Sequence, residues 1–440
     1  MSVGSPIRDG PGEHIQRRHN LSRSGMIMAT FSVDSVRARF PAISRHAHPP
    51  VFLDNAAGTQ VPQSVVDAVA DAMINASCNL GGKFSGSRRA MDIWDAAHQA
   101  GADIVGAPSA RGVIIGQNMT ALTLHISRSI GRLCQPGDEI VVTRMDHEGD
   151  VAPWLLMAED RGLIVRWVSF DKNSWQVSPD ALRAVMGPRT RLVAINYASN
   201  LTGAINDVRA LTQVAHQFGA LVYVDAVQMV PHHLPDVMQL DCDFLICSSY
   251  KFFGPHLGVL WGRESVLERL EAYRCRCVSD DLPGKFEHGT SQTELLAGLA
   301  ATADYLASLG DEAGYSGSRR ERMLGGYKAF EPHETALTLR LIEGIMAIPG
   351  MTIHGITNPN RIAERVPTVS FTHDRISTHA FAQALADQEI FVWSGHNYAI
   401  EPVRHLGLDE DTGVVRLAIA HYNTAAEIDQ VLVALSEIAK

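Results

Sequence analysis

Short apolar segments alternate with helix-like segments over residues 51–270, and this pattern restricts the fold more than any other feature of the sequence. The segments are 112–116 (GVIIG), 139–143 (EIVVT), 163–170, 191–196, 220–225 and 243–249. Near-continuous apolar strands separated by helices are typical of a mostly parallel sheet that helices cover on both faces. In such sheets ligands bind beyond the carboxyl ends of the strands. Polar residues that follow these segments are therefore the first candidates for a site.

The pattern changes beyond about residue 292. Long helix-like stretches precede the apolar segments VPTVSFTH (366–373), IFVWSG (390–395) and VVRLAIAHYNT (414–424), with a helix expected at 377–387. This is typical of a smaller α+β domain. The polar, glycine-rich stretch 310–331 is interpreted as an exposed insertion between helices.

The chain is expected to divide into four parts. Its polar, Gly/Ser/Arg-rich start predicts a disordered extension. The expected parts are a disordered extension at 1–28, a segment at 29–50 that packs with the small domain, a large domain at 51–291 and a small domain at 292–440.

Composition excludes several classes of protein. The net charge of −10, from 38 basic and 48 acidic residues, argues against nucleic-acid binding through phosphates. No apolar run reaches the roughly 18 residues of a membrane span. Six scattered cysteines indicate reduced thiols and a cytoplasmic location. Only Cys275 and Cys277 are close together, and no second pair completes a zinc-like pattern, so no metal site is expected.

Lys251 and Asp225 are the central candidates for chemistry. Lys251 follows the segment 243–249, among aromatic residues and glycines that imply burial. A lysine in apolar surroundings has a lowered pKa and can form a Schiff base. Asp225 ends the preceding apolar segment, where by itself it is equally a strand-end cap. Beside a Schiff-base lysine it is the acid that keeps a pyridine nitrogen protonated.

Other polar residues occupy similar positions. His147 and Asn200 follow apolar segments, and Asn118 and Met119 open the helix after 112–116. Arg416 is the one charge in the apolar segment 414–420, where an edge-strand arginine is the simpler interpretation. A bidentate clamp for a substrate carboxylate is the interpretation we favour.

Several spaced motifs carry a resemblance to a known family. They are VFLDNAAGTQVP (51–62), MDHEGDVAPW (145–154), VDAVQMVPH (224–232), SSYKFFGPHLGVLWG (248–262), FEHGTSQT (286–293) and VRLAIAHYNTAAEID (415–429). In this order they resemble the class V aminotransferase family of pyridoxal 5′-phosphate (PLP) enzymes, and most closely its cysteine desulfurase and selenocysteine lyase branch. The resemblance implies the α/β architecture called fold type I, with a mostly parallel seven-stranded sheet in the large domain.

The resemblance also implies roles for individual residues. Lys251 would hold PLP as a Schiff base, Asp225 would pair with its pyridine nitrogen, and His147 would stack on its ring. Asn200 and Gln228 would meet the phenolic oxygen, while Ser248, Asn118 and Met119 would bind the phosphate. Tyr250 stands where the desulfurases usually have histidine. Thr290 would reach the phosphate from the neighbouring subunit, which implies a homodimer. Arg416, His396 and Asn397 would bind the amino-acid substrate.

One position departs from the family pattern. Group-II desulfurases carry a loop cysteine that attacks the substrate sulfur, but the matching stretch here is WSGHNYA (393–399), with Tyr398 in place of the cysteine and Trp393 in place of an arginine. Tyrosine cannot hold a persulfide. We therefore expect a lyase that abstracts the Cα proton of an amino acid and expels a β-substituent, with Lys251, His147 and Tyr398 as catalytic residues.

Four alternatives remain open at this point. They are an aminotransferase, an epimerase or racemase that uses Tyr398 or His147 as a second acid or base, a desulfurase in which Cys275 or Cys277 replaces the loop cysteine, and a non-catalytic protein that keeps the fold. A dinucleotide oxidoreductase is disfavoured because no G-x-G-x-x-G follows the early strands.

Overall fold

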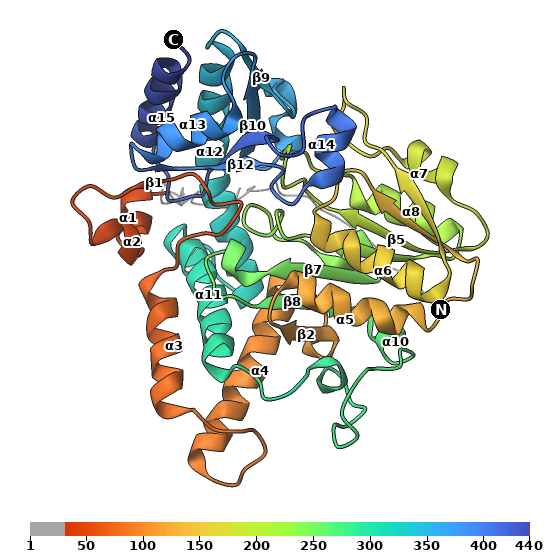
Figure 1. Ribbon diagram of the computed structural model, residues 1–440. Coiled ribbons are helices and arrows are strands. Elements are labelled where there is room, and N and C mark those ends of the chain that lie inside the picture. Colours follow the sequence, from red (N-terminus) through yellow and green to blue (C-terminus); the bar gives the residue numbers. More distant parts are fainter. Residues whose placement is uncertain (1–30) are drawn as a thin grey trace, which may run out of the picture.

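The computed structural model describes residues 31–440, and the predicted extension at 1–28 lies outside the described residues. Within the described part, a seven-stranded sheet with the order β2-β8-β7-β6-β5-β3-β4 forms the centre of the molecule (Figure 1). β8 runs antiparallel to both neighbours, and the remaining pairs are parallel. The strands are β2 (Val113–Gly116), β3 (Glu139–Thr143), β4 (Ile164–Val168), β5 (Thr190–Asn196), β6 (Leu221–Asp225), β7 (Phe244–Ser248) and β8 (Gly258–Gly262). The predicted mostly parallel sheet is confirmed.

Helices cover both faces of this sheet. Successive side chains of each strand point to opposite sides, so each face packs in its own apolar cluster. Ile140 and Val142 of β3 pack in one apolar cluster with residues of α5 and α6, whereas Val141 packs in another with residues of α4, α8 and α11. The helices of this part are α3 (Gln63–Asn75), α4 (Ser85–Val105), α5 (Met119–Gly131), α6 (Ala152–Arg161), α7 (Pro179–Val185), α8 (Val208–Gln217), α9 (Val237–Leu240), α10 (Glu264–Leu267) and α11 (Thr293–Glu312).

The C-terminal part contains a four-stranded antiparallel sheet with the order β12-β13-β10-β9. A third apolar cluster joins this sheet to α12, α13 and α15. Its elements are β9 (Met351–Ile353), β10 (Thr368–His373), β12 (Trp393–Gly395), β13 (Val414–Ala418), α12 (Arg319–Met346), α13 (Thr378–Ala386), α14 (Ile400–Leu406) and α15 (Ala425–Ile438). This matches the predicted smaller α+β domain. The boundary near residue 292 stays a prediction.

Short elements complete the described chain. They are α1 (Val33–Arg37), α2 (Pro41–Ser44), the parallel pair β1 (Val51–Phe52) and β11 (Ile390–Phe391), and 3₁₀ turns at Ala110–Gly112, Glu148–Asp150, Ser249–Lys251, Gly284–Phe286 and Pro359–Glu364.

The prediction of an exposed insertion at 310–331 is wrong. α11 ends at Glu312 and α12 begins at Arg319, so most of this stretch is helix. Ser318 and Glu321 form a capping box that starts α12. A Cβ on Gly326 would lie 2.8 Å from the carbonyl oxygen of Leu306, so this glycine lets α12 pack closely against α11.

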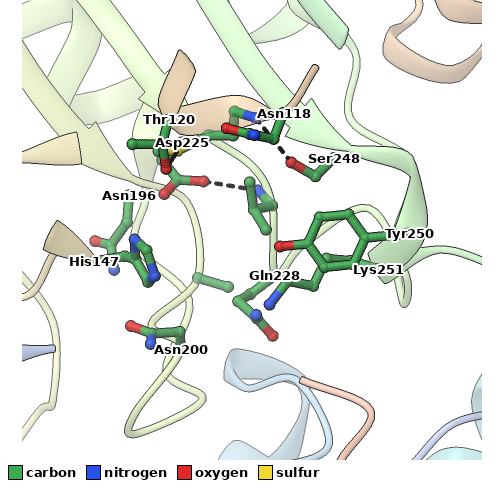
Figure 2. Close-up of a pocket in the computed structure, with 13 residues that line it drawn as sticks. Asn118, Thr120, His147, Asn196, Asn200, Asp225, Gln228, Ser248, Tyr250 and Lys251 are labelled. Carbon is green, nitrogen blue, oxygen red and sulfur yellow. Dashed lines mark hydrogen bonds between the residues drawn. The ribbon is translucent and has the colours of Figure 1, made fainter. Parts of the chain in front are cut away.

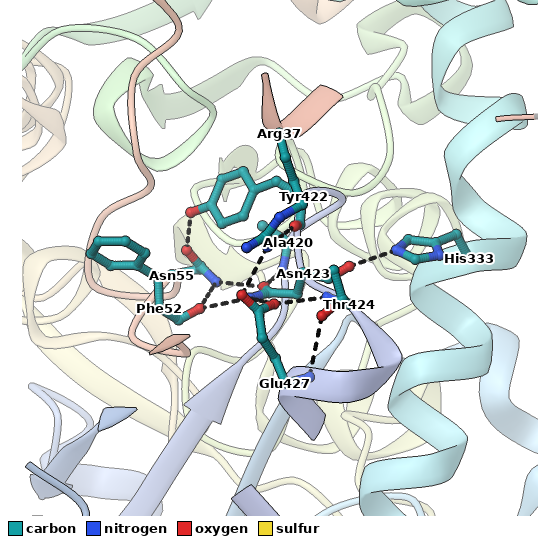
Figure 3. Close-up of polar contacts among 9 residues, drawn as sticks. All are labelled: Arg37, Phe52, Asn55, His333, Ala420, Tyr422, Asn423, Thr424 and Glu427. Atoms are coloured by element: carbon teal, nitrogen blue, oxygen red, sulfur yellow. Dashed lines mark hydrogen bonds and ion pairs between the residues drawn. The ribbon is translucent and has the colours of Figure 1, made fainter. Parts of the chain in front are cut away.

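The segment before β1 packs against the C-terminal part. Arg37 donates to the carbonyl of Tyr422 (2.8 Å) and pairs with Glu427 (2.8 Å) (Figure 3). Phe40 is fully buried, and its ring centroid lies 4.8 Å from that of Tyr422. These contacts join the segment to the C-terminal part; its limits at 29 and 50 stay a prediction, and its first two residues lie outside the described residues. Over residues 31–440, no helix is both long and apolar enough to cross a membrane.

Candidate active site

The parallel strands bring the predicted polar residues to one edge of the central sheet. Asp225 and Ser248 are the last residues of β6 and β7, and His147 follows β3 by a short turn. A cavity lies at this edge (Figure 2). Nine of the predicted site residues line it, namely Asn118, Met119, His147, Asn200, Asp225, Gln228, Ser248, Tyr250 and Lys251.

One end of the cavity is the N-terminus of α5. Asn118 caps this helix by accepting from the backbone N–H of Ala121 (2.9 Å), and the N–H of Met119 donates to the hydroxyl of Ser248 (3.1 Å). A Cβ on Gly258 would lie 2.5 Å from the carbonyl carbon of Asn118, so this glycine allows the helix to start directly against β8. The backbone N–H groups of the first turn and the helix dipole make this end suitable for a phosphate.

Lys251 supplies an amine at the other side of the cavity. Its ammonium group donates to the carbonyl of Ala56, which also accepts from Gln228 (2.8 Å). Burial lowers the pKa of Lys251 to about 7, and the positive charge of Arg416 acts in the same direction, against the opposite pull of Asp225. A large fraction of this amine is therefore neutral and nucleophilic near pH 7.

Asp225 is a buried carboxyl group that faces the same cavity. Its Oδ1 accepts from the N–H of Val227 (2.8 Å), and no basic side chain of residues 31–440 lies within ion-pair distance of it. Burial raises the pKa of Asp225 to about 6, while the Val227 hydrogen bond and Lys251 act in the opposite direction. A cationic nitrogen placed against Asp225 would remove this cost of burial.

His147 presents a neutral ring to the cavity. Burial lowers the pKa of His147 to about 3, with smaller contributions from Lys251 and Arg416. Its Nδ1 accepts from the N–H of Gly149 (2.9 Å), so the single proton of the neutral ring resides on Nε2. Neither nitrogen then has a free lone pair to take a proton from a substrate. The geometry therefore favours a stacking role for His147 over the proton-transfer role that the sequence left open.

A second, larger hollow of about 860 Å³ adjoins this cavity and is lined by the predicted substrate residues Arg416, His396 and Asn397 and by the predicted catalytic residue Tyr398. Arg416 lies on β13, where its Nη1 donates to the carbonyl of Asn200 (3.0 Å). Burial lowers the pKa of Arg416 to about 10. No carboxylate of residues 31–440 pairs with it within 4 Å, so the guanidinium is available to a carboxylate ligand.

The loop after β12 is held in a defined conformation. Asn397 and Tyr398 both have positive φ angles (52° and 56°), which non-glycine residues rarely adopt. Backbone bonds fix the loop: the N–H of Glu148 donates to the carbonyl of Tyr398 (2.7 Å), and Asn200 donates to that of Asn397 (2.8 Å). The Tyr398 ring is 67% exposed and lies over the ring of His147, with centroids 5.6 Å apart.

Thr290 is separate from the residues above. It is exposed and lines a different hollow, beside α5, together with Gln117 and His125. Cys275 and Cys277 are also exposed, and none of the six cysteines, all of which lie in the described residues, lines either cavity of the site. Over residues 31–440, His, Cys, Asp and Glu form no group of three or more that could hold a metal ion.

Thr120, which the sequence places beside Asn118 and Met119 at the start of a helix, also lines the inner cavity. Sequence reasoning missed Asn196, which lines the same cavity. Asn196 is the last residue of β5, so the strand-end rule that selected Asp225 would have found it. The sequence also assigned no functional role to the buried carboxyl groups of Asp146 and Asp150. Burial raises the pKa of both, and each leaves one oxygen without a hydrogen-bond partner.

Comparisons with known proteins agree on one family. The model of the family described as "Aminotransferase class-V" matches residues 51–431. The "Aminotransferase-like protein FGM3" of Gibberella zeae is 32% identical over 94% of this chain and 100% of its own. A cysteine desulfurase of Pectobacterium carotovorum is 28% identical over 93% of this chain and 98% of its own. The solved structure of a cysteine desulfurase from Thermococcus onnurineus superposes with a TM-score of 0.83, at 26% identity, over 94% of this chain and 99% of its own.

Proposed function

The chain belongs to the class V aminotransferase family of PLP-dependent enzymes, and we propose that it eliminates a β-substituent from an amino acid without a persulfide carrier. The observation that carries this proposal is the buried amine of Lys251, which shares its site with Asp225 and Arg416, in cavities that none of the six cysteines lines.

The inner cavity fits the chemistry of the cofactor. Its helix N-terminus, with Asn118, Met119 and Ser248, would hold the phosphate. Asp225 would meet the ring nitrogen, since its buried carboxyl group lacks a cation. The flat ring of His147 would cover one face of the pyridine. Asn200 and Gln228 would serve the phenolic oxygen, and the Oδ1 atom of Asn200 is buried without a partner.

When bound, PLP supplies an electron sink that stabilises negative charge at the Cα atom of the amino acid. Arg416 would hold the α-carboxylate through two parallel hydrogen bonds and so orient the Cα–H bond. Lys251, with its lowered pKa, would take the Cα proton. The electron pair of the C–H bond would form a Cα–Cβ double bond, and the Cβ–S bond would break with its pair on the departing thiolate. Water would then release ammonia and a 2-oxo acid.

Tyr398 and the absence of cysteine at this site are the reasons to propose elimination over sulfur transfer. A desulfurase needs a thiolate next to the substrate sulfur, whereas elimination needs only the base and the leaving group. Cys275 and Cys277 are exposed and line neither cavity of the site, so they do not support a substitute persulfide carrier.

We also propose that the enzyme works as a homodimer. Thr290 is exposed and lies outside the cavity of its own subunit, so it is free to reach the phosphate of a second copy. Light scattering of the purified protein tests the assembly, and Thr290→Ala should weaken PLP binding without changing the mass.

The test of the function combines spectra and products. Purified protein with PLP should absorb visible light through the Lys251 adduct, and Lys251→Ala should lose that band. The protein is then incubated with S-substituted cysteines of both enantiomers. Equal release of thiol, ammonia and 2-oxo acid supports elimination. Formation of a 2-oxo acid that keeps the β-substituent would show transamination instead of elimination. A protein that cannot take up PLP would refute enzymatic function altogether.

Epimerisation is the second candidate, and Tyr398 favours it. The Tyr398 ring packs over His147, and Figure 2 shows His147 and Lys251 on opposite sides of the inner cavity. A phenol on the side away from Lys251 could return a proton to the opposite face of Cα. Inversion of a single enantiomer in deuterated water, with no loss of the β-substituent, would select this reaction.

A further inference from the structure

The outer hollow is larger than a cysteine side chain requires. Its volume is about 860 Å³, against about 70 Å³ for the inner cavity beneath it. Pockets for ligands of drug-like size fall in the range of about 300–1,000 Å³. An amino acid whose carboxylate is held by Arg416 therefore has room for a long side chain toward the mouth.

The charges of the hollow change sign from base to mouth. Lys251 and Arg416 lie at its base, whereas the charged residues of its mouth are Glu148 and Asp411. Within residues 31–440, neither of these two carboxylates accepts a hydrogen bond or forms an ion pair. Burial raises the pKa of Glu148, followed by repulsion from Glu401, while the weaker attractions of Arg404 and His396 act in the opposite direction.

Neighbouring basic side chains are engaged elsewhere. Arg144 pairs with Glu401, and Arg404 bonds to Glu401 (3.1 Å) and to Glu410 (2.7 Å). The carboxylates at the mouth are thus open to a cation that comes from outside the protein.

Two exposed aromatic rings accompany these carboxylates. Trp393 is the cross-strand partner of Arg416 in the β12–β13 pair, so both side chains lie on one face of the sheet, with Cβ atoms about 4.5–5.5 Å apart. Trp393 is 52% exposed and Tyr398 is 67% exposed, and both line the hollow. Aromatic faces next to a carboxylate attract organic cations.

We propose that the substrate is an amino acid with a long side chain that ends in a cation. Its α-carboxylate would lie on Arg416, and its terminal ammonium or guanidinium group would lie between Trp393 and Tyr398, close to Glu148. This inference rests on the proposed function and names the substrate class of the same site.

Two isosteric probes test the charge alone. S-(2-aminoethyl)cysteine carries a terminal ammonium group, and S-propylcysteine replaces it with a methyl group. The holoenzyme is titrated with each at pH 8, and binding is followed by the visible spectrum of the cofactor and by the shift in Tm. The cationic probe should bind at least about 10-fold more tightly, as a carboxylate and two aromatic faces together imply.

Variants of the mouth test which residues produce the preference for the cationic probe. Glu148→Gln and Trp393→Leu should each reduce this preference by about 3- to 10-fold while the spectrum of bound PLP stays unchanged. Glu159→Gln is the matched control, since it removes the same charge from an exposed residue of α6 that lines neither hollow. It should leave the preference unchanged.

Three results would overturn the assignment. Equal affinity for the two probes would do so, as would a preference for the cation that survives in both mouth variants. If no amino acid changes the spectrum or the Tm of a holoenzyme that binds PLP, the proposed function fails as well. By contrast, spectral change with S-propylcysteine but no preference for the cation refutes only the substrate class.

Discussion

Gly258→Ala is predicted to displace the phosphate end of the site. A Cβ at this position would lie 2.5 Å from the carbonyl carbon of Asn118 and 2.7 Å from its oxygen. Carbon atoms meet at about 3.5 Å, so the start of α5 or of β8 has to move by about 1 Å. Both Asn118 atoms belong to the backbone, so no rotation of a side chain relieves the contact.

The expected loss of affinity concerns the phosphate group of PLP. A shift of about 1 Å at a binding site weakens function up to about 100-fold, so the Kd for PLP should rise about 10- to 100-fold, or about 1.4–2.8 kcal/mol. The free energy of unfolding of the apo-protein should fall by about 1–3 kcal/mol, as for other overpacked positions. Pyridoxal, which has no phosphate, should lose much less affinity than PLP does.

Fluorescence titration of apo-protein with PLP and with pyridoxal measures both affinities, and urea unfolding of the apo-protein measures the free energy of unfolding. Gly284→Ala is the matched control, because a Cβ there meets no atom within 4 Å. Wild-type PLP affinity in Gly258→Ala, or an equal loss for PLP and pyridoxal, would refute the view that this glycine positions the helix N-terminus for a phosphate.

Three further predictions concern the reacting groups. The rate of PLP uptake by the apo-enzyme should rise with pH through a midpoint of about 7. Burial lowers the pKa of Lys251 from 10.5, and only the neutral amine reacts. A midpoint near 10.5 would contradict the burial argument. If the His147 ring stacks on PLP and transfers no proton, His147→Phe should keep turnover within about 10-fold, whereas His147→Ala should lose PLP affinity. Loss of turnover in the Phe variant at normal PLP affinity would instead support an acid–base role. Tyr398→Cys should not create efficient persulfide formation, since Trp393 also stands where the resemblance to the desulfurases implies an arginine. Strong persulfide formation seen by mass spectrometry would contradict this expectation.

The inner site was predictable from the sequence because one rule covers it. Residues at the carboxyl ends of parallel strands converge at one edge of a sheet, so Asp225, Ser248 and His147 could be grouped without knowledge of the strand order. The same rule applies to Asn196, which was overlooked although it ends β5. The rule does not reach the outer hollow, where residues of β12, β13 and the loop after β3 meet through tertiary packing alone.

The error at 310–331 has a different origin. Glycine and polar residues lower the expected helix content of this stretch, but Gly326 is required by the close approach of α12 to α11 and not by a turn. The signal that α12 begins here was present, since Ser318 and Glu321 have the spacing of a capping box. The low helix propensity of this stretch is thus outweighed by helix packing between residues that are far apart in the sequence.

The residues of the two cavities come from different parts of the fold. The groups assigned to PLP belong to the central sheet and its loops, whereas Arg416, Trp393 and Tyr398 belong to β12, β13 and the loop that follows β12. That loop is anchored to the central part by the backbone carbonyls of Tyr398 and Asn397, which accept from Glu148 and Asn200, and the Tyr398 ring also lies against that of His147. The two backbone bonds do not involve the side chain at position 398. Trp393 and Tyr398 both line the outer hollow, so together they enlarge the aromatic surface that is available to a substrate side chain.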